Sequence, residues 1–341
     1  MTRSRRARLS VGALLPLLAL SACGSAPDTD AEEPAAGAAA SAFPMTFDSC
    51  GTDVTVPAAP ERVLSFYPTM TEMMVALGLE DRLVGQVNTQ YGTPSEQYAD
   101  AYDAVRVVAE GEPSAETVIG ERPDLLLAEQ EWRFDGKRLP TRASYAEDGL
   151  PVLVSESLCA DTKTETTVPD TYEDLERLGR LFGVEERAAD LVAELEDVVA
   201  GVQEAVAGEE PASLAILSVY ESTLYVQAGG LYTDVVERAG GRNLITSADL
   251  PAGEYYAAWS PEKIVRLNPD VIVFPYNDEQ VRETALAYIE DRLGTTDAVR
   301  GGRVVGVPEP VFGGGVRSSL GVEEVARLLH PEMFTDGEEQ E

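Results

Sequence analysis

The sequence has few of the side chains on which most catalytic and nucleic-acid-binding sites depend. Among 341 residues there are one histidine, three cysteines, and 26 basic residues against 60 acidic ones, for a formal net charge of −34. A chain with this charge repels phosphate backbones, which excludes nucleic acid as a partner. A lone histidine, His330, excludes a metal centre built from several histidines and disfavours a serine–histidine triad. We therefore expect no catalytic residue, no metal site and no resident cofactor.

The N-terminus combines a charged, an apolar and a small-residue segment, which is typical of a secretory signal. Its apolar run is too short to span a bilayer. Leu20-Ser-Ala-Cys23 looks like a lipobox, whose cysteine becomes lipidated after cleavage; an ordinary signal with a chance cysteine is the alternative. The lipid would tether the protein to the outer face of the cell membrane. Residues 23–42, rich in Ala, Pro, Asp and Glu, are predicted to be a flexible tether.

Two cysteines remain after the signal, Cys50 and Cys159. Thiols tend to pair outside the cell, so we predict a disulfide between them. It would close a loop of about 110 residues, which stabilises by about 4–5 kcal/mol in the chain-entropy model. Two unpaired buried thiols are the alternative.

An internal repeat organises the chain. Residues 114–127 (SAETVIGERPDLLL) resemble residues 260–273 (SPEKIVRLNPDVIV), with Ser, Glu and Pro-Asp at the same spacing. In each copy the serine is a candidate N-cap, the proline ends a short helix, and the apolar run predicts a buried strand. A weaker pair in the same order, 71–78 and 233–240, predicts two helices that end at glycine. These matches indicate two similar α/β lobes.

A long segment without proline separates the copies. Residues 184–207 carry apolar side chains at spacings of three and four, which predicts one amphipathic helix. The apolar positions are Ala188, Leu191, Leu195, Val198, Val202 and Ala205. We expect this helix to be a single bridge between the lobes; a surface helix of one lobe is the alternative.

Strands alternate with helices in both lobes, which predicts an α/β fold with two Rossmann-like lobes and mostly parallel sheets. The predicted strands are Arg62 to Phe66, Arg82 to Val87, Arg106 to Val108, Asp124 to Ala128, Pro151 to Ser155, Leu214 to Val219, Leu224 to Val226, Val271 to Phe274 and Arg303 to Val307. The predicted organisation is a signal peptide (1–22), a tether (23–42), a first lobe (43–180), an inter-lobe helix (181–208) and a second lobe (209–341). Ligands of such sheets bind beyond the carboxyl ends of the strands.

Several stretches, taken in order, resemble one family. The segment 60–85 contains Pro-Glu-Arg-Val-Leu-Ser, a Thr-Glu pair and Ala-Leu-Gly-Leu-Glu-Asp-Arg-Leu-Val-Gly. With Ala239-Gly-Gly-Arg-Asn-Leu and Trp259-Ser-Pro-Glu-Lys-Ile-Val-Arg-Leu-Asn-Pro-Asp270, it is similar to substrate-binding proteins of ABC importers for ferric siderophores and cobalamin. The resemblance extends from about Phe47 to about Leu329 and implies a monomeric binding lipoprotein, without enzymatic activity, that delivers its ligand to a membrane permease.

The resemblance also implies permease docking through one acidic residue on each lobe. The positions that match are Glu72 and Glu237. The internal repeat instead aligns Asp234 with Glu72, and we keep Asp234 as the alternative to Glu237. A solvated helix face is the other interpretation of these acids.

Aromatic residues gather at the predicted strand ends, where rigid rings give large contact areas and polar edges. Arginine can hold carbonyl or carboxylate oxygens there. The candidate ligand-binding residues are Tyr67, Trp132, Arg133, Tyr220, Tyr225, Tyr256, Trp259, Tyr276 and Arg317.

Few of these candidates are cationic, and a highly anionic chelate would need several cleft arginines. We therefore expect a neutral or cationic hydroxamate siderophore carrying ferric iron first, a corrinoid such as cobalamin second, and haem as a minor alternative. An extracellular enzyme on the same scaffold is the competing class. It lacks support because the sequence contains no G-x-S-x-G motif and no paired catalytic groups.

Overall fold

A computed structural model describes residues 43–159 and 163–334. The predicted signal peptide, Cys23 and the tether lie outside the described residues. All described residues belong to one compact unit. Within this part of the chain, no helix is both long and apolar enough to cross a membrane.

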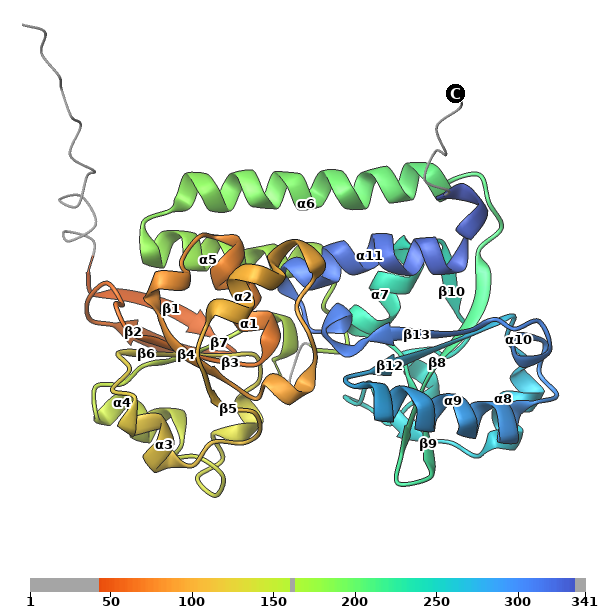
Figure 1. Cartoon of the computed structure of the whole chain (residues 1–341), viewed down its shortest axis with the longest axis horizontal. Helices are drawn as coiled ribbons and strands as arrows, with labels where there is room; N and C mark the ends of the chain where they lie inside the picture. Colours follow the sequence, from red (N-terminus) through yellow and green to blue (C-terminus); the bar gives the residue numbers. More distant parts are fainter. Residues whose placement is uncertain (1–42, 160–162, 335–341) are drawn as a thin grey trace, which may run out of the picture. The chain divides into compact units, whose positions relative to one another are not determined.

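The first lobe is built on a parallel five-stranded sheet with the strand order β5-β4-β3-β6-β7. Its strands are β3 (Val63–Phe66), β4 (Leu83–Val87), β5 (Val107–Ala109), β6 (Leu125–Ala128) and β7 (Val152–Val154). Its helices are α1 (Pro68–Ala76), α2 (Ala99–Ala104), α3 (Ala115–Gly120), α4 (Arg142–Glu147) and α5 (Tyr172–Phe182). Helices cover both faces of the sheet (Figure 1), which explains why β3 and β6 are buried along their whole length.

The second lobe contains a mixed six-stranded sheet. Strands β10, β8, β12 and β13 pair in parallel, while β9 and β11 pair antiparallel at one edge. Its strands are β8 (Ala212–Tyr220), β9 (Thr223–Gln227), β10 (Gly241–Asn243), β11 (Tyr256–Ala258), β12 (Val271–Tyr276) and β13 (Val304–Pro308). Its helices are α7 (Gly230–Arg238), α8 (Pro261–Leu267), α9 (Glu279–Leu293) and α10 (Asp297–Arg300). The expected α/β fold with two mainly parallel sheets is therefore confirmed.

Two long helices link the lobes, where the sequence predicted one. Helix α6 (Glu185–Val206) lies across α5 of the first lobe and α11 (Gly315–Leu329), as Figure 1 shows. Helix α11 in turn packs on both α1 and α7. The buried side of α6 is formed by Ala188, Leu191, Leu195, Val199, Val202 and Val206. Val198 and Ala205, two predicted members of this stripe, are only half-buried because the stripe advances by one residue along the second half of the helix.

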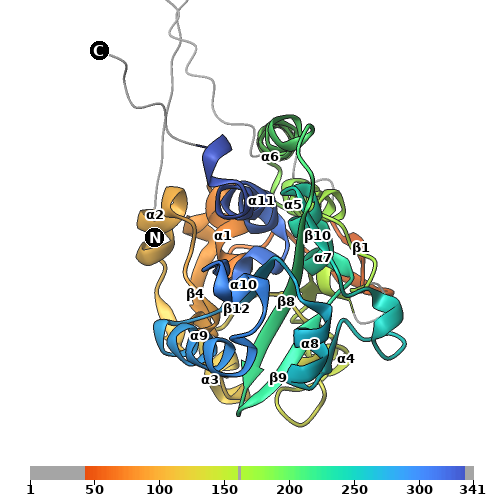
Figure 2. The same ribbon diagram turned by 90° about the vertical axis from the view of Figure 1, so that its right-hand side faces the viewer.

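The internal repeat produces matching units in the two lobes. Helices α3 and α8 follow Ser114 and Ser260 and lead into β6 and β12. The Ser114 hydroxyl accepts a hydrogen bond from the backbone N–H of Thr117, as an N-cap does. Figures 1 and 2 both show α3 and α8 on the side of the sheets that faces away from α6.

A short antiparallel hairpin precedes the first lobe and was not predicted. It consists of β1 (Met45–Ser49) and β2 (Thr52–Val56). Cys50 in its turn is bonded to Cys159, with the two Cα atoms 5.2 Å apart. The predicted cysteine pair is thus the pair that the structure joins, and it attaches the hairpin to the segment that follows β7.

Candidate ligand-binding site

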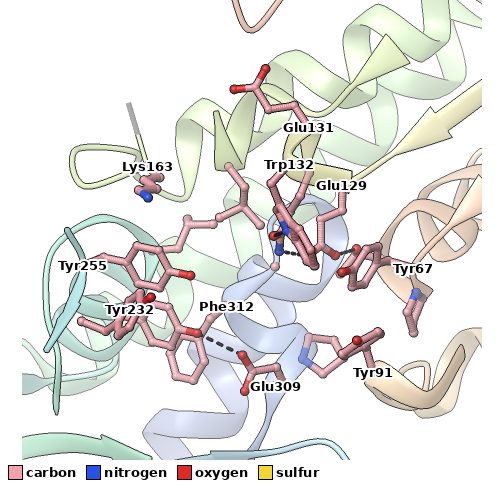
Figure 3. Close-up of a pocket in the computed structure, with 18 of the residues that line it drawn as sticks. Tyr67, Tyr91, Glu129, Glu131, Trp132, Lys163, Tyr232, Tyr255, Glu309 and Phe312 are labelled. Atoms are coloured by element: carbon pink, nitrogen blue, oxygen red, sulfur yellow. Dashed lines mark hydrogen bonds between the residues drawn. The ribbon is translucent and has the colours of Figure 1, made fainter. Parts of the chain in front are cut away.

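A cavity of about 610 Å³ lies between the two lobes, at the carboxyl ends of strands such as β3, β6 and β13. One wall comes from the first lobe and contains Tyr67 and Trp132, while the other comes from the second lobe and contains Tyr232 and Tyr255 (Figure 3). A cavity of this size, lined by rings and a few polar groups, is typical of small-molecule sites.

The wall of the first lobe is arranged around a buried arginine. Tyr67 directly follows β3 with φ = 78°, an unusual backbone conformation for a tyrosine, and its hydroxyl accepts a 2.7 Å hydrogen bond from Nε of Arg133. Arg133 also forms an ion pair with Glu112, and its guanidinium carbon lies 4.3 Å from the centre of the Trp132 ring. Burial and the nearby Arg138 lower the pKa of Arg133 to about 10. The guanidinium thus holds Tyr67 and Trp132 in place.

Stacked rings form the wall of the second lobe. The Tyr232 ring lies between Phe312 and Tyr255, at centroid distances of 4.6 and 5.6 Å. Burial raises the pKa of Tyr232 well above its usual value and raises that of Tyr255 to about 12. Both phenols therefore stay protonated at neutral pH and offer O–H donors and flat faces.

A buried carboxylate, Glu129, and a half-buried one, Glu309, complete the cavity. Glu129 follows β6 and accepts hydrogen bonds from the Thr69 hydroxyl and from Nε2 of Gln130. Burial raises its pKa to about 7, and the negative charge of Glu309 adds to that effect. Glu309 follows β13, and the Tyr232 hydroxyl donates a 3.0 Å hydrogen bond to its Oε1. Burial raises the pKa of Glu309 as well.

Four of the nine predicted ligand residues line this cavity, namely Tyr67, Trp132, Arg133 and Tyr256. The other five lie elsewhere. Tyr220 is 66% exposed at the β8–β9 turn, and Tyr225 on β9 faces Tyr256 at 6.0 Å. Although β8 runs parallel to β12, it continues into an antiparallel hairpin with β9, and neither Tyr220 nor Tyr225 of this hairpin lines the cavity.

Packing accounts for the remaining predicted aromatics. Trp259 and Tyr276 pack against the core of the second lobe, and the Lys263 ammonium lies 4.6 Å from the Trp259 ring. The Arg282 guanidinium lies 5.9 Å from the Tyr276 ring. Neither ring lines the cavity.

The structure corrects the assignments of Glu72 and Arg317. Glu72, proposed for docking, has no exposed surface, so it cannot contact a permease. Its Oε1 accepts a 3.0 Å hydrogen bond from the backbone N–H of Ser95, and its Oε2 lies 3.9 Å from Nε of Arg317. Burial raises the pKa of Glu72, while Arg317 and Ser95 oppose that shift. Arg317 is 5% exposed and pairs with Glu72 instead of lining the cavity.

The other docking candidates lie on α7. Glu237 is exposed, and burial and the neighbouring Asp234 raise its pKa. Asp234 is half-buried; it accepts a hydrogen bond from the backbone N–H of Val168 and pairs with Arg238 at 2.6 Å. Asp234 thus fixes α7 to a neighbouring loop.

Sequence reasoning selected four of the 20 residues that line the cavity. Tyr91, Glu129, Lys163, Tyr232, Tyr255, Glu309 and Phe312 line it without having been selected. Glu129 and Glu309 each follow a predicted strand directly, and this position was the signal that could have singled them out among 60 acids. Tyr232 lies inside a helix, where the hydrophobic pattern indicates only packing.

Among the described residues, the one cluster of histidine, cysteine or acidic side chains that could hold a metal ion lies outside the cavity. Ligand atoms of three histidine, cysteine or acidic residues come close enough for a metal ion only at Cys50, Glu156 and Cys159, and both sulfurs there are joined in the disulfide. The cavity itself offers aromatic faces, phenol donors and carboxylate acceptors. Such a set binds a ligand by shape and hydrogen bonds.

Comparisons with known proteins agree with this geometry. Residues 63–311 match the model of a family described as periplasmic binding protein. A cobalamin-binding protein of Halobacterium salinarum is 31% identical, over 90% of this chain and 79% of its own length. The ABC transporter substrate-binding lipoprotein YvrC of Bacillus subtilis is 27% identical, over 97% of this chain and 99% of its own. The crystal structure of an ABC-type Fe³⁺-hydroxamate transport system protein from Saccharomonospora viridis superposes with a TM-score of 0.69 at 26% identity, covering 84% of this chain and 99% of the other.

Proposed function

The chain belongs to the periplasmic binding protein family, and from this premise we propose that it captures a corrinoid and delivers it to a membrane permease. It is the substrate-binding protein of an ABC importer. The observation that carries the corrinoid assignment is the pair of aromatic walls on either side of the cavity. Trp132 from the first lobe and Tyr255 from the second present flat faces against which a broad macrocycle can lie.

The comparisons support a corrinoid ahead of the other metal chelates. The Halobacterium relative that shares 31% of its aligned residues with this chain is described as binding cobalamin. A ferric hydroxamate is the second candidate, supported by the Saccharomonospora structure and by the scarcity of cavity arginines. Haem is the third candidate, because phenols such as Tyr67 and Tyr255 line the cavity and a tyrosine can ligate haem iron.

The proposed cellular setting follows from the N-terminal sequence. A lipid on Cys23 would hold the protein at the extracytoplasmic face of the membrane through the tether of residues 23–42. There it would act as a monomer beside its permease.

Docking needs one exposed acid on each lobe, and the internal repeat offers an equivalent pair. Glu116 and Glu262 lie in the first turns of α3 and α8, are both exposed, and belong to helices on the side of the sheets away from α6. We assign docking to this pair in place of Glu72.

Ligand titration tests the proposal, and the two tryptophans of the chain allow the signal to be assigned. The Trp259→Phe variant retains only Trp132, so quenching of its fluorescence reports on the cavity. We expect saturable quenching by cyanocobalamin and weaker or no quenching by ferrioxamine B, haemin and ferric citrate. Tight binding of ferrioxamine B without binding of cyanocobalamin would establish the second candidate instead. Binding of none of the four would contradict the transport function.

A further inference from the structure

Each lobe contributes one carboxylate to the same cavity, and Glu129 is buried while Glu309 is half-buried. Glu129 comes from the end of β6 in the first sheet, and Glu309 from the end of β13 in the second. The side chain of Glu129 is only 7% exposed, and its Oε2 lies close beneath the backbone of Gly313. Figure 3 shows the two carboxylates on different sides of the ligand space, among the aromatic rings.

The hydrogen bonds that the structure gives to these carboxylates all come from neutral groups. Thr69 and Gln130 donate to Glu129, and Tyr232 donates to Glu309. A buried carboxylate with only neutral donors keeps most of its charge uncompensated and favours a nearby cation or further N–H donors. The two carboxylates also interact electrostatically, since the negative charge of Glu309 raises the pKa of Glu129.

Two basic residues, Arg133 and Lys163, belong to the lining of the cavity. Arg133 contacts the Tyr67 hydroxyl and pairs with Glu112. The Lys163 ammonium lies 5.1 Å from the centre of the Tyr255 ring. Two further acids, Glu131 and Glu254, belong to the lining, so acids outnumber basic residues there. The lining therefore has four acids and two basic residues, and its two cations offset the acidic charge only in part.

We propose that Glu129 and Glu309 act together as a charge filter that selects ligands presenting a cationic or N–H-rich group to the cavity and rejects anionic chelates. The proposal rests on the function proposed above and adds the residues that set specificity. Because one carboxylate comes from each lobe, the filter is complete only when both lobes face the ligand. A cation bound between them would favour the ionised form of both carboxylates, whose pKa values are raised by burial.

Two pairs of ligands that differ in charge but little in shape test the filter. Aquocobalamin carries one positive charge more than cyanocobalamin, and linear ferrioxamine B carries an ammonium group that cyclic ferrioxamine E lacks. For whichever pair binds, we expect the wild-type protein to bind the cationic ligand more tightly than its neutral counterpart. Glu129→Gln and Glu309→Gln keep the side-chain shape and should each weaken binding of the cationic member about tenfold, with an effect of about twofold or less on the neutral member.

A control variant separates this local effect from the total charge of the protein. Glu290→Gln on α9 removes the same charge from an exposed position away from the cavity and should leave the charge preference unchanged. Thermal unfolding verifies that the variants fold. If the wild-type protein binds ligand but the two cavity variants keep its charge preference, the filter is refuted while the transport function stands. If the wild-type protein binds none of the four ligands, the proposed function fails and the filter fails with it.

Discussion

At the scale of single residues, Trp132 is the largest exposed ring among the residues that line the cavity. It is 45% exposed, yet its ring rests on the Arg133 guanidinium, so the ring is accessible and already ordered. Trp132→Ala should therefore weaken ligand binding by about 10- to 100-fold without lowering the melting temperature appreciably. Isothermal titration calorimetry measures the affinity without relying on tryptophan fluorescence.

Tyr220 provides the matched control for Trp132. It is also an exposed aromatic at a predicted strand end, but the structure places it outside the cavity. Tyr220→Ala should leave the affinity unchanged. If it weakened binding as much as Trp132→Ala, the ligand would occupy a different surface from the one described.

The raised pKa of Glu129 predicts a pH dependence of stability. Its pKa is about 7 in the folded protein and about 4.5 in an unfolded chain, so between these values the folded state binds the additional proton. The contribution of Glu129 to stability is therefore present below about pH 4.5 and decreases as the pH rises to about 7, by up to about 3 kcal/mol.

Glu129→Gln removes this titration. The melting temperature of the variant minus that of the wild-type protein should be larger at about pH 8 than at about pH 5. Differential scanning calorimetry of both proteins at the two pH values measures the difference. An equal offset at both values would show that Glu129 titrates normally in the folded protein.

At the scale of elements, the pair between α1 and α11 is a structural link between the lobes. Glu72 is fully buried and Arg317 nearly so, which means that either side chain alone would leave a buried charge uncompensated. Glu72→Gln should lower the free energy of unfolding by about 3 kcal/mol, and the double variant Glu72→Leu with Arg317→Leu by less than the sum of its single changes. Urea unfolding of the variants tests this coupling.

An exposed pair of the same type gives the reference value. Glu279 and Arg282 on α9 lie 2.7 Å apart with both side chains largely exposed, so Glu279→Gln should change stability by about 0.5 kcal/mol or less. If Glu72→Gln and Glu279→Gln lowered the free energy of unfolding by similar amounts, burial would not strengthen the pair of Glu72 and Arg317.

The elements themselves were predictable wherever the sequence carries a clear apolar pattern. Strands β6 and β12 are continuous apolar runs, each preceded by a short helix that begins after a serine, and the structure confirms both strands. Strands β1 and β2 escaped notice because they form a half-exposed hairpin in which threonine and aspartate alternate with apolar residues. Strands β10 (GRN) and β11 (YAA) lack the valines that marked the equally short β5 (VVA) and β7 (VLV).

The site was less predictable than the fold, because its residues are brought together by contacts between lobes. Tyr232 and Phe312 are distant in sequence and stack only once α7 packs beside α11. Family resemblance placed docking on Glu72 from a sequence motif, but burial against Ser95 and Arg317 depends on tertiary packing that a motif does not report.

At the scale of the whole molecule, the equivalent acids Glu116 and Glu262 predict how the protein meets its permease. The Glu116→Arg, Glu262→Arg double variant should abolish ligand uptake by cells while leaving the affinity of the purified protein unchanged, because both residues are exposed and lie outside the cavity. Uptake of labelled ligand and calorimetry measure the two properties.

Glu237→Arg is the comparison for this prediction, because Glu237 is exposed on α7 and was the docking residue suggested by the resemblance. Loss of uptake in Glu237→Arg, with normal uptake in the double variant, would return docking to α7. A loss of affinity in the double variant would indicate that these acids also affect the cavity.

The disulfide gives the folded chain a mechanical property. A pull on the N-terminal side of β1 would separate β1 from β2, one residue pair after another, until it reached Cys50. There the covalent bond would pass the load to Cys159. Cys159 follows Leu158, which lines the cavity, so the load would arrive beside the ligand and not along β3. A protein held by its N-terminal end against flow would thus carry tension through this bond to the segment that follows β7, and not through β2 to β3.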